Sequence, residues 1–295
     1  MDRVWKCRLL VFLILLLTLA AGLVSAADFR QERLQVFVSI LPQKFFVERI
    51  GGDAVQVSVL VGPGQSPAVY EPLPQQMAAL AEAALYFRIG VPFETIWMGR
   101  IEELNPRLKV VDTRQGLQLR RIEGARGGQA ELEVADPHIW LDPLLVKVQG
   151  ETIYKELSLA DPSKRDFYGQ NLAEFLAELE QLHQELAAIF SSLPTPKLMV
   201  FHPAWGYLAD RYGLEQIPIE VEGKEPGPRA LAEFVQLAET EGIKVIFVEE
   251  QSSAQAAYSV AEAVGAKVVK IDPLAEDYLS NLRQIARVIQ KEQEQ

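Results

Sequence analysis

One long helical repeat near the middle of the chain constrains the fold more than any other feature of the sequence. Asp161 suits an N-cap and Pro162 the first helical position. Apolar residues then recur at three- and four-residue spacing until Pro194 and Pro196 end the pattern beyond Ser192. The sequence therefore predicts a helix of roughly 30 residues, about 45 Å long, which we interpret as a connector between two halves. The repeating residues are Leu172, Phe175, Leu176, Leu179, Leu182, Leu186 and Phe190.

Short β-rich runs alternate with helical stretches on both sides of this repeat. Strands are predicted at 34–40, 55–61, 84–89 and 109–112, and again at 197–201, 243–248 and 267–271. Helices are predicted at 42–50, 73–83 and 94–104, and later at 205–212, from 228, at 254–264 and at 278–290. The alternation predicts an α/β fold with two lobes, each a mostly parallel sheet flanked by helices, joined by one long rigid helix.

The same pattern gives the expected domain boundaries. An N-terminal α/β lobe is predicted at 27–160, the connecting helix at 161–193 and a C-terminal α/β lobe at 194–295. Within the first lobe, residues 114–134 are rich in Gly, Arg, Gln and Glu and are predicted to form a polar loop.

Residues 1–26 have the three-part pattern of a secretory signal peptide. Basic residues come first, residues 9–23 are almost wholly apolar, and small residues precede a cleavage point after Ala26. The apolar run is short for a membrane span, so we expect cleavage and a periplasmic or otherwise extracytoplasmic protein. Cys7, the chain's single cysteine, lies in this segment, so the remaining chain is expected to have neither a disulfide nor a thiolate metal ligand.

The charge of the chain narrows its possible partners. The formal net charge is −11, and it is −13 without residues 1–26. Such an acidic chain argues against a nucleic-acid partner. The negative charge is only weak evidence for a cation as ligand, because solubility alone explains an acidic surface. We expect a monomer.

Two of the chain's three histidines and one aspartate are the candidate metal ligands. His138 and His202 lie in predicted loops among rigid and aromatic residues, and Asp272 directly follows a predicted strand, as His202 does. Ligands bind at the carboxyl ends of strands in open α/β sheets. Two imidazoles and a carboxylate suit Zn²⁺, and less exclusively Mn²⁺ or Fe²⁺. Composition alone equally allows both histidines to be buried, hydrogen-bonded residues.

Other residues near these motifs have plainer interpretations. His183 lies beside the apolar stripe of the long helix, and we expect it to be a partly exposed helix residue. Trp140, Trp205 and Tyr207 are expected to pack around the site. Glu249 and Glu250 end a strand, where either is an acceptor for an imidazole N–H or a solvated strand end.

Several dispersed segments form a recognisable set: Ile50-Gly51-Gly52-Asp53, 59–64, Tyr70-Glu71-Pro72, 136–143, 201–207, 222–226, 245–249 and Ile271-Asp272-Pro273-Leu274. With them, the chain from Leu34 onward resembles the metal-binding substrate-binding proteins of bacterial zinc/manganese ABC transporters. The resemblance implies two α/β lobes joined by one long helix, with the metal in the cleft between them. It assigns His138, His202 and Asp272 as ligands, and histidine at position 202 is usual in the zinc branch.

The chain departs from the family pattern at one expected ligand. The family has a histidine two residues before the tyrosine of its Tyr-Glu-Pro motif, where this chain has Ala68. Three readings stay open. Three protein ligands plus water hold the ion, Glu71 or Tyr70 substitutes, or the site is degenerate and serves another ligand. The polar loop at 114–134 also lacks the histidines that zinc members often carry there.

The leading hypothesis is an extracytoplasmic protein that captures a divalent metal ion, preferentially zinc, and delivers it to an ABC transporter permease with its ATPase. An alternative is a receptor of the same fold with a degenerate metal site that serves another ligand or adhesion. An exported zinc hydrolase is weaker, because the chain has no His-Glu-x-x-His sequence and no evident nucleophile motif. We therefore expect no enzymatic activity.

Overall fold

The computed structural model describes residues 33–122, 135–220, 224–251 and 254–294. The predicted signal peptide, most of the predicted polar loop and the start of the 222–226 motif lie outside these residues. Within them, no helix combines the length and the apolar character of a membrane span.

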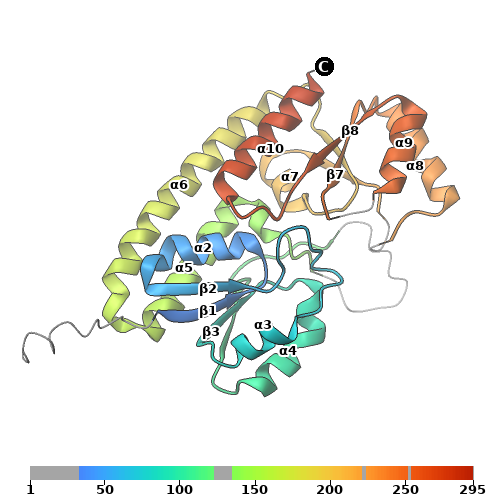
Figure 1. The fold of residues 1–295 in the computed structure, drawn as a ribbon. Coiled ribbons are helices and arrows are strands. Elements are labelled where there is room, and N and C mark those ends of the chain that lie inside the picture. Colours follow the sequence, from blue (N-terminus) through green and yellow to red (C-terminus); the bar gives the residue numbers. More distant parts are fainter. Residues whose placement is uncertain (1–32, 123–134, 221–223, 252–253, 295) are drawn as a thin grey trace, which may run out of the picture. The chain divides into compact units, whose positions relative to one another are not determined.

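The first lobe is built on a parallel sheet. Its strands, in spatial order, are β2 (Val55–Val59), β1 (Leu34–Val38), β3 (Leu85–Arg88) and β4 (Lys109–Asp112). Helices α2 (Leu41–Gly51), α3 (Pro74–Leu80) and α4 (Pro92–Leu104) connect them (Figure 1). Gly52, with φ at +51°, ends α2 in a conformation that favours glycine, and the 3-10 turn η1 (Gly52–Ala54) leads into β2.

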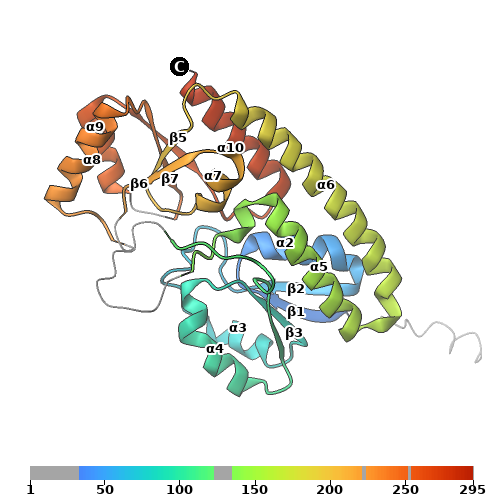
Figure 2. The same cartoon turned by 180° about the vertical axis from the view of Figure 1, so that it is seen from behind.

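The second lobe repeats the plan. Its strands, in spatial order, are β6 (Glu215–Pro218), β5 (Lys197–Val200), β7 (Val245–Glu249) and β8 (Lys267–Ile271), all parallel. The helices are α7 (Gly206–Tyr212), α8 (Pro228–Thr240), α9 (Gln255–Val264) and α10 (Tyr278–Gln293) (Figure 2). Among the described residues each sheet therefore has four strands, and the strand order reverses beside β1 and beside β5, where such sheets bind ligands.

The long helix begins later than the sequence predicts. Asp161 caps a 3-10 turn, η3 (Pro162–Lys164), by accepting a hydrogen bond from Ser163 N at 3.1 Å, and α6 (Arg165–Ser191) follows. The predicted apolar stripe is buried, apart from the partly buried Leu176. Helix α6 contacts α2 and α5 (Pro143–Ala160) as well as α7 and α10. The α/β prediction with a long connecting helix is confirmed, whereas the predicted domain boundaries stay predictions.

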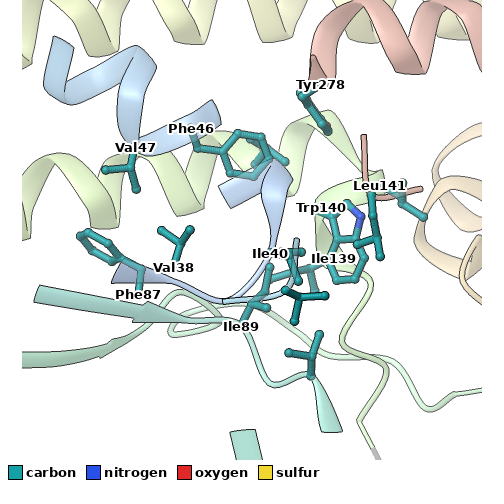
Figure 3. Packing of buried hydrophobic residues seen from close by; sticks show 14 of the residues in the cluster. Val38, Ile40, Phe46, Val47, Phe87, Ile89, Ile139, Trp140, Leu141 and Tyr278 are labelled. Atoms are coloured by element: carbon teal, nitrogen blue, oxygen red, sulfur yellow. The ribbon is translucent and has the colours of Figure 1, made fainter. Parts of the chain in front are cut away.

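Aromatic side chains of α2 and α10 pack together in one apolar core. The ring of Phe46 on α2 meets Tyr278 at the start of α10 edge-on, with centroids 4.8 Å apart. Figure 3 shows Ile40, Ile139 and Trp140 packed beside one another below these rings. All five residues are almost wholly buried. This core underlies the segment that carries His138.

Candidate metal site

His138 immediately precedes η2 (Ile139–Leu141) and is almost buried, with 8% of its surface exposed. Its Nδ1 lies 2.7 Å from Asp136 Oδ1, and the same oxygen accepts from His138 N at 2.9 Å. Burial lowers the pKa of His138, and the hydrogen bond and charge of Asp136 offset this effect only partly. The imidazole is therefore neutral near pH 7, which is the state that binds metals.

His202 follows β5 and is held by two glutamates. Its Nδ1 lies 2.7 Å from Glu220 Oε2, and its backbone N donates to Glu249 Oε2 at 3.1 Å. Burial lowers the pKa of His202, but the hydrogen bond and charge of Glu220, together with the charge of Glu249, outweigh it and raise that pKa overall. Burial also raises the pKa of Glu249, which accepts a second hydrogen bond from Trp205 Nε1 at 3.0 Å.

The structure brings the two predicted histidines together. Their ring centroids are 5.2 Å apart and the ring planes cross at 74°. One ring comes from the segment before α5 and the other from the carboxyl end of β5, so residues 64 positions apart in the sequence meet. Because both Nδ1 atoms face carboxylates, Nε2 is the atom of each ring left for a ligand.

Asp272 follows β8, as predicted, but does not complete a three-residue group. Its Oδ1 accepts from Gln251 Nε2 and from Leu274 N, both at 2.8 Å. The next residue, Pro273, accepts a hydrogen bond from Trp140 Nε1 at 2.8 Å, which ties this segment to the one carrying His138. Within the described ranges, no three His, Cys, Asp or Glu residues are grouped closely enough to hold a metal. The ligand set of His138, His202 and Asp272 thus stays a prediction.

The two candidate substitutes for the missing histidine differ in their surroundings. The ring of Tyr70 is buried against Phe93 with centroids 5.4 Å apart, and its hydroxyl donates to Gln76 Oε1. Burial raises the pKa of Tyr70, which disfavours the phenolate that would bind an ion. Glu71 and Ala68 are exposed. Glu71 is therefore the better placed of the two substitutes to change position.

Several of the remaining sequence interpretations fit the contacts, but both interpretations of Glu249 are wrong, because its side chain is buried and does not accept from an imidazole ring. Trp140 and Trp205 are buried, and His183 is partly buried with Nδ1 3.2 Å from the Tyr212 hydroxyl. Glu249 accepts from the backbone of His202 rather than from its ring. The acceptor for that ring, Glu220, is missing from the sequence interpretation. The available signal was an acidic residue just after a short apolar run, Ile217-Pro218-Ile219.

Known proteins share this sequence and fold. The chain matches the family described as "Zinc-uptake complex component A periplasmic" over residues 36–292. It is 28% identical to the high-affinity zinc uptake system protein ZnuA of Bacillus subtilis, over 93% of this chain and 90% of that protein. It is 28% identical to the manganese ABC transporter substrate-binding lipoprotein PsaA of Streptococcus mitis, over 82% and 79%. A crystal structure of ZnuA superposes with a TM-score of 0.85 at 46% identity, covering 89% of this chain and all of that one.

These matches confirm the resemblance inferred from the motifs. They also confirm that the chain is a binding component rather than an enzyme, since the family and these relatives are substrate-binding components of metal uptake systems. The chain belongs to the periplasmic zinc-uptake component family, the metal-binding substrate-binding proteins of ABC transporters.

Proposed function

We propose that this protein captures Zn²⁺ outside the cytoplasmic membrane and delivers it to the permease of an ABC transporter, whose ATPase drives uptake. The observation that supports this most is the meeting of His138 and His202, with ring centroids 5.2 Å apart and each Nδ1 bound by a carboxylate. Imidazole nitrogens at such separation suit a zinc ion that both rings can reach in their neutral form.

Asp272 is the proposed third ligand, in the cleft between the lobes. Its Oδ1 is held by Gln251 and Leu274, which leaves Oδ2 as the oxygen to turn toward the ion. Asp272 lies outside any three-residue group among the described residues, so the proposal includes a shift of the segment after β8 toward the ion. Ala68 offers no donor, so a water molecule completes the coordination, with Glu71 as the alternative.

Two imidazoles favour zinc over manganese, because carboxylate and water oxygens suit manganese better. The relatives include both zinc and manganese proteins, so the choice of ion is open to a direct test. The decisive measurement is calorimetric titration of the metal-free protein with Zn²⁺ and, separately, Mn²⁺. We expect one saturable Zn²⁺ site, and weaker binding of Mn²⁺.

Single-histidine variants locate the site in the same titration. His138→Ala and His202→Ala should each remove most of the zinc binding. His183→Ala is the matched control, because His183 lies on α6 with its ring against Tyr212 and should leave the affinity unchanged. Absence of saturable Zn²⁺ binding in the unmodified protein would refute the proposal. If all three variants bind Zn²⁺ as tightly as the unmodified protein does, the site lies elsewhere.

A further inference from the structure

Both candidate histidines bind a buried carboxylate through the same ring atom. Asp136 is fully buried, Glu220 is 9% exposed, and each lies 2.7 Å from the Nδ1 atom of its histidine. The two pairs arise independently: Asp136 is two residues before His138, whereas Glu220 comes from the segment after β6 and reaches His202 at the end of β5. Two unrelated stretches of chain therefore provide the same local contact.

This contact determines the tautomer of each ring. An ionised carboxylate can only accept hydrogen bonds, so Nδ1 of a neutral imidazole beside it must carry the hydrogen. Nε2 then keeps its lone pair. In both rings, therefore, the nitrogen that faces away from the carboxylate is the one able to bind a cation.

Further hydrogen bonds fix the carboxylates and the histidine backbones. Asp136 Oδ1 also accepts from His138 N at 2.9 Å, which closes a short loop around the ring. On the other side, Glu249 bridges His202 N and the indole of the buried Trp205. The orientation of both rings is therefore set before an ion arrives, which reduces the entropy lost on binding.

We infer that Asp136 and Glu220 are positioning residues of the metal site: they hold both imidazoles in the Nδ1–H tautomer and direct both Nε2 atoms to the ion. The inference rests on the proposed function. Their negative charges also make the two nitrogens better donors, which supports an ion in a site that has alanine where the family has a further histidine.

The test uses metal-free protein labelled with ¹⁵N at histidine, because the tautomer can be measured by NMR without any ion. Glu220→Leu removes the acceptor, whereas Glu220→Gln keeps one acceptor oxygen at the same reach, removes the charge and replaces the other oxygen with an NH₂ donor. At a pH above the raised pKa of His202, we expect its ring to be Nδ1–H in the unmodified protein and Nε2–H in the Leu variant. The Gln variant should keep Nδ1–H with its amide oxygen facing the ring. Asp136→Asn and Asp136→Leu give the same comparison at His138.

Zinc titration of the same variants supplies the second measurement. The Leu variants should bind Zn²⁺ about 10- to 100-fold more weakly, and the amide variants should lose less. Glu233→Gln, which removes an exposed carboxylate on α8, is the control and should change neither measurement.

Each result bears on the inference. An Nδ1–H tautomer that persists in folded Glu220→Leu, or zinc affinity equal to that of the unmodified protein, would overturn it. Should that variant fail to fold, an Nε2–H tautomer at His202 or His138 in the unmodified protein would overturn it equally. If the unmodified protein shows the Nδ1–H tautomers but binds no Zn²⁺, the proposed function fails while the carboxylate control of the tautomer stands.

Discussion

The hydroxyl of Tyr207, on α7, donates a hydrogen bond to the backbone carbonyl oxygen of Asp136 at 2.9 Å. The same hydroxyl oxygen accepts from Arg120 N at 3.0 Å. Burial raises the pKa of Tyr207 to about 12, so the hydroxyl keeps its hydrogen at neutral pH. A residue of the second lobe thus fastens the segment that positions His138.

Tyr207→Phe should weaken this link. The substitution keeps the buried ring but leaves two backbone groups without their partner, so we expect a loss of about 1–3 kcal/mol in the free energy of unfolding, measured with urea. Zinc affinity should fall as well, because the segment that carries His138 loses the hydrogen bond from Tyr207 to the Asp136 carbonyl oxygen. Tyr258→Phe, at a side chain that is 44% exposed, is the control. Unchanged stability and affinity in Tyr207→Phe would contradict the expectation.

Ala68→His should restore a ligand that the family has and this chain lacks. If the site is a truncated zinc site, the added third imidazole should tighten zinc binding by about tenfold or more, or ~1.4 kcal/mol. The measurement is competition of each variant with a chromogenic zinc chelator. Val69→His places the same group on a neighbour that is 81% exposed, and it should have little effect. Equal affinity in Ala68→His and the unmodified protein would favour a different ligand for this protein.

Asp272→Asn separates the charge of the third proposed ligand from its hydrogen bonds. The amide oxygen can still accept from Gln251 and Leu274 N, so the segment after β8 should keep its conformation. The lost negative charge should weaken zinc binding by about tenfold, or ~1.4 kcal/mol, in calorimetry. Asp53→Asn, at an exposed position in η1, controls for net charge. A variant that binds zinc as the unmodified protein does would remove Asp272 from the ligand set.

The sequence predicts most elements of this fold because strands and helices differ strongly in apolar spacing, but it does not predict α5 or β6. The buried face of α5 has helical spacing, but Gln149 and Gly150 interrupt its apolar residues, and glycine usually weakens a helix. A Cβ at position 150 would lie 3.3 Å from Leu172 Cδ1 of α6, closer than an ordinary van der Waals contact, so glycine suits the close packing of the two helices. The helix is stabilised by its Asp142 cap and by packing against α6. Strand β6 reads Glu215-Gln216-Ile217-Pro218, and its polar start and proline lack the apolar run that marks the other four-residue strands.

The same limits apply to the site. The loop positions of His138 and His202 could be predicted, and His202 also follows a strand, where ligands gather in parallel sheets. The partner of His202 could not, since Glu220 follows β6 and its proximity depends on strand order. The position of Asp272 relative to the rings depends on the packing of the two lobes, which no sequence spacing encodes.

Glu94, at the start of α4, is a fully buried carboxylate whose titration should affect stability. It accepts hydrogen bonds from Ser39 Oγ at 2.5 Å and from Ile89 N and Gly90 N at 2.8 and 2.7 Å. Burial raises the pKa of Glu94 above its ordinary value of 4.5, and these donors, with the charge of Arg88, offset the effect only in part. The folded protein therefore releases this proton at a higher pH than the unfolded chain does.

The sign of the pH dependence follows from that raised pKa. The stability that Glu94 contributes is fully present below pH 4.5, its unfolded pKa, and is lost as the pH rises through its folded pKa. Glu94→Gln does not titrate, so unfolding in urea between about pH 4 and about pH 8 should show the unmodified protein losing stability relative to the variant as the pH increases. Lost hydrogen bonds add a constant offset. Glu103→Gln, at an exposed position of the same helix, should run parallel to the unmodified protein. A difference between Glu94→Gln and the unmodified protein that stays constant with pH would refute the raised pKa.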